Sequence, residues 1–170
     1  MNVEIVTIGD ELLLGFTVDT NTSFLGRELA SLGVTVVRHT TCGDDVDVIV
    51  ETVREALERT GVVITTGGLG PTADDMTVEA VAKLFGRSMT RDESVARWLE
   101  QRWLTYRRDG PIPESNYKQA MIPTGAEIVA NPIGSAPGVL VTDERGRWVA
   151  TLPGVPREAR AMFTESLRPR

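Results

Sequence analysis

The pattern of apolar and polar positions at the start of the chain predicts a strand, a helix and a second strand. Val3–Ile8 is a short apolar run that ends at Gly9, which is typical of a buried strand. Leucines recur at helical spacing over 21–32, and Gly33 follows as a helix stop signal. Val34–Thr41 then has the composition of a strand.

The same alternation continues as far as Gly86. Apolar residues at helical spacing over Val46–Leu57 predict a second helix, and the acidic residues in its first turn suit the helix dipole. Val62–Thr66 is β-branched throughout and is the clearest strand in the chain. A glycine-rich loop follows, and then a third helix over about Val78–Phe85. Strands and helices in this order are typical of an α/β fold, with a mostly parallel sheet covered by helices on both faces.

The second half of the chain has a different pattern. Thr90 and Glu93 have the spacing of a capping box, which predicts a long helix through about Arg108. Asp109–Pro113 breaks that helix, and a shorter one is expected over about Ser115–Met121. The remaining expected elements are strands at 127–130, 138–142 and 148–152, a turn at 143–146 that makes the last two an antiparallel hairpin, and a final helix from about Pro156. We find no repeat or linker and expect one domain over residues 1–170.

Composition and charge narrow the class of protein. The 170 residues include 24 acidic and 18 basic side chains, a formal net charge of -6, which argues against a nucleic-acid binder with a broad basic surface. Since Cys42 and His39 are single, an internal disulfide, a thiolate-rich zinc site and a site with two histidine ligands are excluded. No apolar stretch approaches a membrane span and no secretory signal opens the sequence, so we expect a cytoplasmic protein without membrane contact.

The loop after the third strand holds the densest group of candidate functional residues. Its three glycines let the backbone approach a ligand closely, and ligands of open α/β sheets bind beyond the carboxyl ends of strands. Backbone N–H groups and a threonine hydroxyl can hold phosphate, whereas Asp74 and Asp75 can do so only through a divalent cation. The alternative is a tight turn with an aspartate helix cap. The candidate phosphate-binding residues are Gly67, Gly68, Gly70, Pro71 and Thr72.

Two familiar nucleotide-binding motifs are excluded. Gly68–Ala73 matches G-x-G-x-x-A, but it follows the third strand, and Asp92, at the distance of the usual acidic partner, lies in the expected capping box. The P-loop sequence G-K-[ST] is absent, which disfavours an ordinary nucleoside triphosphatase.

Acidic residues also follow the other two strands of the first half. Asp10 and Glu11 follow the first strand, and Asp44 follows the second. Taken singly, each is an acidic turn or a helix-start charge. Together with Asp75 they lie at the carboxyl ends of parallel strands, so we expect them around one crevice. Two further Gly/Pro loops are candidates to complete it, with Ser135, Gly138 and Gly154 as the candidate substrate-binding residues alongside Asp10 and Glu11.

These motifs together resemble the N-terminal domain of the CinA family, the competence/damage-inducible proteins. That domain belongs to the wider superfamily of molybdopterin-binding domains from molybdenum-cofactor biosynthesis. The resemblance spans essentially the whole chain. The motifs that carry it are Gly9-Asp-Glu-Leu-Leu-Leu-Gly15, Thr66-Gly-Gly-Leu-Gly-Pro-Thr72, Asp74-Asp75-x-Thr77, Gly134-Ser-Ala-Pro-Gly138 and Leu152-Pro-Gly-Val-Pro156.

The resemblance implies a three-layer α/β/α fold and a site for a phosphorylated nucleotide or pterin at the glycine-rich loop. CinA-type domains are associated with metal-dependent hydrolysis of the pyrophosphate in ADP-ribose, whereas molybdopterin relatives bind the pterin phosphate and some adenylylate it with ATP and Mg²⁺. Two aspartates that matter in those relatives match Asp44 and Asp75 by position. Leu69 stands where molybdopterin proteins usually carry threonine, which favours the CinA-like form. Full-length CinA also carries a C-terminal amidase domain, which we expect to be absent from residues 1–170.

We therefore hypothesise a metal-dependent pyrophosphohydrolase that acts on ADP-ribose or a similar nucleoside diphosphate compound. Asp75 and Asp44 are its candidate catalytic residues, and Asp75, Asp74 and Asp44 are candidate ligands of a divalent ion of the Mg or Co type. Molybdopterin binding, pterin adenylylation, and nucleotide binding without turnover are the alternatives. The expected partners are a small phosphorylated ligand and further copies of the chain, for which the helix with Trp98 and Trp103 offers surface.

Overall fold

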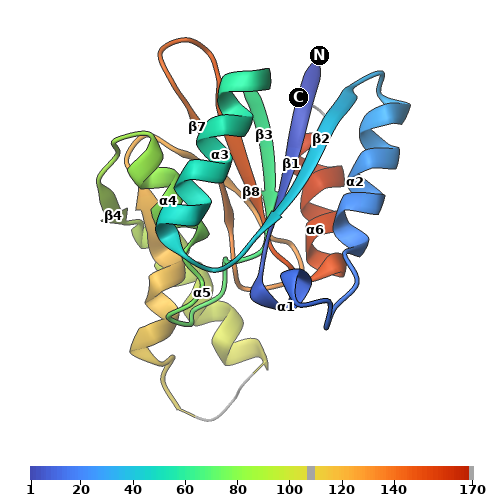
Figure 1. Cartoon of the computed structure of the whole chain (residues 1–170). Helices are drawn as coiled ribbons and strands as arrows, with labels where there is room; N and C mark the ends of the chain where they lie inside the picture. Colours follow the sequence, from blue (N-terminus) through green and yellow to red (C-terminus); the bar gives the residue numbers. More distant parts are fainter. Residues whose placement is uncertain (107–109, 169–170) are drawn as a thin grey trace.

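The computed structural model describes residues 1–106 and 110–168 and builds them around one central sheet (Figure 1). Its strands, in spatial order, are β2 (Thr35–Cys42), β1 (Asn2–Ile8), β3 (Val62–Thr66), β8 (Trp148–Leu152), β7 (Gly138–Thr142) and β6 (Glu127–Val129). The first four of these run parallel to one another, and β7 is antiparallel to both of its neighbours. The expected mostly parallel sheet and the β7–β8 hairpin are therefore confirmed.

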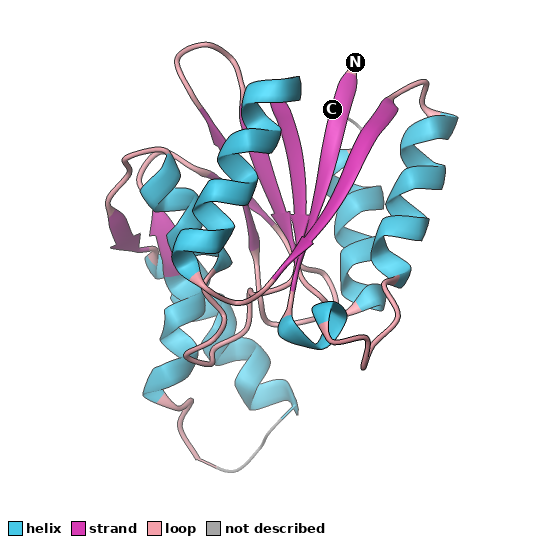
Figure 2. Cartoon of the chain, viewed as in Figure 1, coloured by secondary structure: helices cyan, strands magenta, loops and turns pink. Residues whose placement is uncertain are grey.

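Helices cover both faces of the sheet, as Figure 2 shows. On one face lie α2 (Thr20–Ser31) and α6 (Pro156–Met162), which continues into the π-helical turn η2 (Phe163–Leu167). On the other lie α3 (Val46–Thr60), α4 (Thr77–Leu84) and α5 (Glu93–Tyr106). Alternate residues of the buried strands supply the two cores, so that Ile5 and Ile64 pack toward α2 and α6 while Val6 and Val63 pack toward α3. The molecule thus has the three layers that the resemblance implied.

Several short elements were not expected. They are α1 (Asp10–Leu13), the strand β4 (Met89–Arg91) and its antiparallel partner β5 (Met121–Pro123). The short helix expected over 115–121 is a 3₁₀ helix, η1 (Glu114–Ala120), and Met121 already belongs to β5. The expected end of α5 near Arg108 and the break at Asp109 lie outside the described residues.

The predicted capping box is wrong. Thr90 is held extended in β4 by its pairing with Ile122, so it cannot cap the following helix. Asp92 takes that role instead, because its carboxylate accepts hydrogen bonds from the N–H groups of Ser94 at 2.9 Å and Val95 at 3.0 Å. These are the geometry and residue type of an ordinary N-cap.

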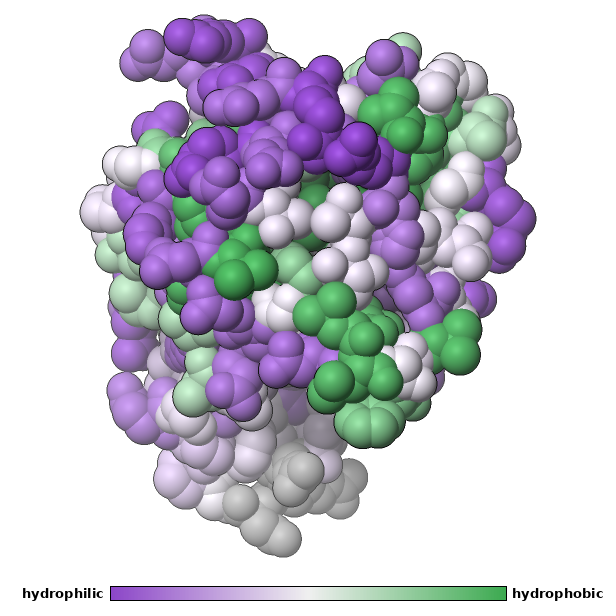
Figure 3. Space-filling view, in the orientation of Figure 1, coloured by the Kyte–Doolittle hydropathy of each residue, from purple (hydrophilic) through white to green (hydrophobic). Residues whose placement is uncertain are grey.

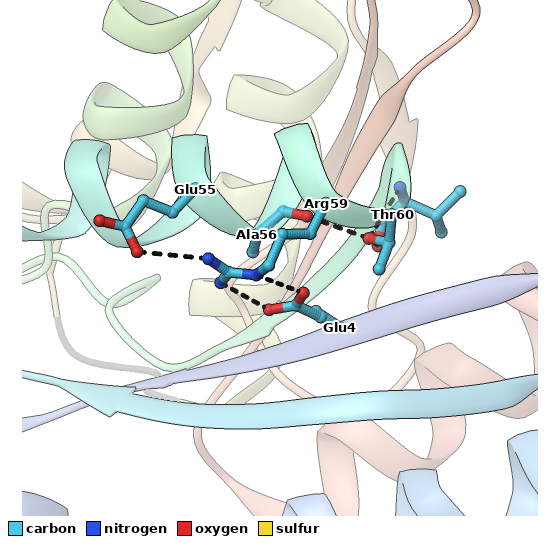
Figure 4. A network of polar contacts seen from close by, with 6 residues as sticks. Glu4, Glu55, Ala56, Arg59 and Thr60 are labelled. Atoms are coloured by element: carbon cyan, nitrogen blue, oxygen red, sulfur yellow. Dashed lines mark hydrogen bonds and ion pairs between the residues drawn. The ribbon is translucent and has the colours of Figure 1, made fainter.

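A buried ion pair links α3 to strand β1 (Figure 4). The Glu4 side chain is 1% exposed and accepts two hydrogen bonds from Arg59, at 2.8 and 2.9 Å. Arg59 also reaches Glu55 on its own helix at 3.3 Å, and these carboxylates raise the pKa of its guanidinium. Without Arg59, the Glu4 carboxylate would be buried with no cation beside it. The ion pair therefore favours one position of α3 on β1.

One part of the surface is distinctly apolar. Figure 3 shows this patch over the segment between α1 and α2, where Leu14, Phe16 and Val18 are 67%, 81% and 81% exposed. The segment follows directly on the acidic residues after β1. In the described ranges, no helix combines the length and the hydrophobicity needed to cross a membrane.

Candidate functional site

A cleft of about 480 Å³ lies beyond the carboxyl ends of β1, β3 and β8. Most of the residues that the sequence singled out line it, namely Glu11, Asp44, Gly67, Gly68, Gly70, Pro71, Thr72, Asp74, Asp75, Ser135 and Gly154. Segments far apart in the chain therefore meet at one edge of the sheet, as expected for open α/β folds.

The first two glycines of the loop are required by the protein's own packing. A Cβ on Gly67 would lie 2.0 Å from the Ile8 carbonyl oxygen, and its φ of +104° lies in the left-handed region. A Cβ on Gly68 would lie 2.2 Å from Oγ1 of Thr77, which donates to the Gly67 carbonyl at 2.8 Å. The loop is thus pressed against β1 and the start of α4, and this contact fixes the position of its backbone.

Asp75 belongs to the loop and does not cap the following helix. Its carboxylate accepts hydrogen bonds from the N–H of Thr72 at 2.9 Å and from the Thr72 hydroxyl. The N-cap of α4 is Met76, with no side-chain capping bond. A Cβ on Gly70 would lie 2.5 Å from Asp75 Oδ2, so this glycine makes room for the carboxylate. The helix-cap alternative for Asp75 is therefore wrong, while Asp74 is exposed beside it.

The acidic residues after β1 and β2 form hydrogen bonds with each other. The backbone N–H of Asp10 donates to Asp44 Oδ2 at 3.0 Å, and the N–H of Asp44 donates to Asp10 Oδ1 at 3.4 Å. The pKa of Asp44 is raised, first by burial and then by the charges of Asp10, Glu11 and Asp75, while the Asp10 N–H opposes the shift. The carboxylates of three strand ends thus lie close enough to repel one another.

These carboxylates fit a divalent cation that is shared with a ligand. Mg²⁺ prefers hard oxygen ligands and usually takes one or two carboxylates together with substrate phosphates. Within residues 1–106 and 110–168, no three His, Cys, Asp or Glu side chains form a ready-made metal group. Asp44 and Asp75, facing one cleft beside exposed Asp74, would therefore hold a cation together with phosphate oxygens rather than alone.

Two residues of η1 shape the loop, and no motif or spacing along the chain pointed to them. Gln119 donates from Nε2 to the Leu69 carbonyl at 3.2 Å, and Lys118 donates to the Thr72 carbonyl at 2.8 Å. Gln119 is 7% exposed and lines the cleft, yet its Oε1 accepts no hydrogen bond from the described part of the chain. The Oε1 atom is itself buried, so Gln119 acts on the cleft through its bond to Leu69, which helps to hold the backbone of the loop.

Glu158, on α6, is a further lining residue that sequence reasoning missed. Its carboxylate accepts from Asn131 Nδ2 at 2.7 Å. The amide oxygen of Asn131 in turn accepts from the N–H groups of Ile133 at 3.1 Å and Gly134 at 2.7 Å. This network explains why the loop before β7 stands beside the cleft and brings Ser135 into it.

Two expected site residues, Gly138 and Asp10, are not among the residues that line the cleft. Gly138 starts β7, where a Cβ would lie 2.0 Å from the Thr151 carbonyl oxygen, so close strand packing accounts for this glycine. Asp10 is exposed and exchanges hydrogen bonds with Asp44, and a Cβ on Gly43 would lie 2.4 Å from Asp10 Oδ1. Both support the cleft without being among the residues that line it.

The single histidine and cysteine do not pair with each other. His39 Nε2 lies 3.2 Å from a carboxylate oxygen of Asp19. Cys42 is buried, and burial raises the pKa of its thiol to about 11. A thiol with this pKa stays protonated near neutral pH and is a poor nucleophile.

Comparison with known proteins identifies the family and the fold of the chain. A family model described as a probable molybdopterin binding domain matches residues 4–170. A CinA-like protein from Gemmatimonas aurantiaca is 61% identical over 99% of the chain, but the chain spans only 39% of the length of that relative. The crystal structure of the protein CinA from Thermoplasma acidophilum superposes with a TM-score of 0.90 at 36% identity, covering 99% of this chain and 96% of that one. The molybdopterin biosynthesis enzyme MoaB from Thermus thermophilus shares the fold, with a TM-score of 0.64 and 23% identity over 98% of this chain and 89% of its own.

Proposed function

The chain belongs to the family of probable molybdopterin binding domains, as a CinA-like member, and on that premise we propose that it hydrolyses the diphosphate linkage of a nucleotide such as ADP-ribose. The observation that carries the proposal is the meeting of Glu11, Asp44 and Asp75 beside a fixed glycine-rich loop in one cleft. A site that only bound anions would gain nothing from these carboxylates.

Each part of the cleft has a separate task in this proposal. The backbone N–H groups of the Gly67–Thr72 loop bind phosphate oxygens, and the packing of the loop against β1 orients them in advance. Asp44 and Asp75 hold a divalent ion of the Mg or Co type, aided by exposed Asp74. When bound, such an ion supplies neutralisation of phosphate charge and activation of water. Asp75, fixed by Thr72, orients the attacking water at the loop. We further propose that the chain acts as a homo-oligomer.

The second candidate function is binding of a molybdopterin-type ligand, with or without adenylylation. The family membership and the fold shared with MoaB favour it. It uses the same glycine-rich loop for the pterin phosphate. The two functions differ in their products, since hydrolysis of ADP-ribose releases AMP and ribose 5-phosphate whereas adenylylation consumes ATP.

Replacing Asp75 by Asn tests the hydrolytic proposal. Asn keeps the size of the side chain and an oxygen to accept the Thr72 N–H, but it removes the negative charge. We expect turnover of ADP-ribose with Mg²⁺ or Co²⁺ to fall by about 100-fold or more, because loss of one positioned acid–base group typically costs that much. The melting temperature should stay almost unchanged, because Asp75 caps no helix.

Asp74→Asn is the matched control for this experiment. Asp74 is the exposed neighbour, so its loss should reduce turnover much less. Near-normal turnover in Asp75→Asn would exclude the catalytic role and leave ligand binding as the better account.

A further inference from the structure

Lys118, on η1, holds the far end of the glycine-rich loop without lining the cleft. Its Nζ donates to the Thr72 carbonyl at 2.8 Å and lies 3.5 Å from Met76 Sδ and 3.5 Å from Glu79 Oε1. Three acceptors thus surround a single ammonium, which carries three donors. Since Lys118 is not among the residues that line the cleft, it acts on the site through the residues that it holds.

Thr72 and Asp75 form a closed set of hydrogen bonds at that point. The N–H and the hydroxyl of Thr72 both donate to Asp75 Oδ2, and the N–H of Asp75 donates back to the Thr72 carbonyl at 3.3 Å. Lys118 donates to the same carbonyl. Within residues 1–106 and 110–168, the second carboxylate oxygen of Asp75, Oδ1, accepts no hydrogen bond, so it is the oxygen left for a cation. The position of Thr72 therefore decides where Asp75 presents this oxygen.

The helix η1 is itself anchored, which gives Lys118 a fixed base. The hydroxyl of Tyr117 donates to Glu100 on α5 at 2.6 Å, and Gln119 donates to the Leu69 carbonyl. A 3₁₀ helix has three residues per turn, so three successive side chains point in three directions. Tyr117 thus joins η1 to α5, while the next two residues hold the loop at two points.

We propose that Lys118 is a positioning residue for the metal-binding carboxylate of Asp75. By holding the Thr72 carbonyl, it fixes the turn in which Thr72 occupies Oδ2 and leaves Oδ1 for the cation. This inference rests on the proposed function for the presence of a divalent cation. It adds a residue outside the cleft lining on which the affinity for that cation depends. Loss of a residue that orients a metal ligand typically lowers metal affinity by about 10- to 100-fold.

The experiment measures Co²⁺ affinity by isothermal titration calorimetry with AMP present, and ADP-ribose turnover in a separate assay. Lys118→Met keeps an unbranched side chain but removes the ammonium, so Co²⁺ affinity should fall about tenfold. The variant should fold, because Lys118 belongs to neither core. Lys83→Met is the matched control and should leave Co²⁺ affinity unchanged, because Lys83 is the other lysine of the chain and pairs with Asp47 outside the cleft lining.

Glu79→Gln separates positioning from the ion pair. This change removes the charge beside Lys118 and leaves the bond from Lys118 to Thr72 in place. An ion pair between partly exposed side chains contributes little. Co²⁺ affinity should therefore stay close to that of the unaltered protein. Equal losses in Lys118→Met and Glu79→Gln would show that only the ion pair matters, and would overturn the inference.

A double variant tests whether Lys118 acts through Thr72. Thr72→Val removes the hydroxyl that donates to Asp75 but keeps the backbone N–H. Since both changes release the same carboxylate, Lys118→Met combined with Thr72→Val should bind Co²⁺ only slightly more weakly than the weaker single variant. Losses that multiply, or an unchanged Co²⁺ affinity in Lys118→Met, would overturn the inference.

The two assays keep the inference and the proposed function apart. Co²⁺ binding that depends on Lys118, without hydrolysis of ADP-ribose, would leave the inference standing and refute the proposed activity. Hydrolysis of ADP-ribose with a Co²⁺ affinity that is independent of Lys118 would refute the inference and leave the activity standing.

Discussion

At the scale of single residues, the site works against the stability of its own fold. The pKa of Asp44 is raised by burial and by the charges of Asp10, Glu11 and Asp75, so its ionised form opposes folding. A group with a raised pKa stabilises the folded state below its unfolded pKa, and this contribution is lost as the pH rises through the folded value. Such a conflict between charge and stability is common where function requires the charge.

Asp44→Asn should therefore raise the melting temperature at pH 7 in EDTA, by about 2 °C. The amide oxygen can still accept the Asp10 N–H. The gain should shrink as the pH falls, because Asp44 of the unaltered protein, with its raised pKa, becomes protonated before an ordinary aspartate does. The control is Asp47→Asn: a hydrogen bond from Lys83 lowers the pKa of Asp47, so its loss should bring no gain. An unaltered or lower melting temperature in Asp44→Asn would refute this interpretation of the cluster.

The acidic residues of the site could be predicted from the sequence, because their position follows from the order of the parallel strands alone. Asp10, Glu11, Asp44 and Asp75 each follow a strand that the pattern predicted, and parallel strands end at one edge. Gln119 and Glu158 reach the same cleft from a 3₁₀ helix and the last helix. No local spacing reports where those elements pack, so their role needed the structure.

At the scale of elements, the start of α5 shows what decides a helix boundary. The sequence pattern predicts Thr90 as the cap, but the pairing of β4 with β5 holds Thr90 in a strand, and Asp92 caps the helix instead. Strands of three residues carry too little pattern to be predicted, so the sequence pattern alone favours Thr90.

Asp92→Ala should lower the free energy of unfolding by about 1 kcal/mol, which corresponds to about 2–4 °C in melting temperature. The Ser94 hydroxyl and the N–H of Val95 lower the pKa of Asp92. Its contribution is therefore present above the unfolded pKa and is lost as the pH falls through the lower folded value. Glu93→Gln removes the partner that a capping box would use and should change stability little. Thermal unfolding of both variants between pH 3 and pH 7 checks this, and a larger loss in Glu93→Gln would restore the capping box.

At the scale of the whole molecule, the layered order of strands and helices was predictable through β3, and so was the terminal hairpin. Both follow from periodicity and from turn residues at 143–146. The pairing of β3 with β8 could not be predicted in the same way, because these two strands are distant in the chain. That pairing brings the Gly154 loop beside Gly67, with a Cβ on Gly154 3.5 Å from the Gly67 Cα. The cleft is consequently a product of the complete sheet.

The negative charge of the molecule and of its cleft should make the binding of a metal ion and the binding of a phosphorylated ligand depend on each other. The chain has a formal net charge of -6, and Glu11, Asp44 and Asp75 face the cleft. A phosphorylated ligand adds negative charge to this edge, so it should bind weakly unless a cation accompanies it. Since the described residues offer no ready-made group of three ligands, the cation in turn needs phosphate oxygens.

We therefore expect Mg²⁺ alone and AMP alone each to raise the melting temperature by less than about 1 °C, and the two together by about 4 °C or more. EDTA should abolish the combined effect, and sodium chloride at equal ionic strength should not replace Mg²⁺, because screening does not supply a shared ligand. In Asp44→Asn the combined shift should fall toward the sum of the separate ones, since one carboxylate of the shared site has lost its charge. Strictly additive shifts in the unaltered protein would show that metal and nucleotide bind apart, and the carboxylates at the strand ends would then need another explanation.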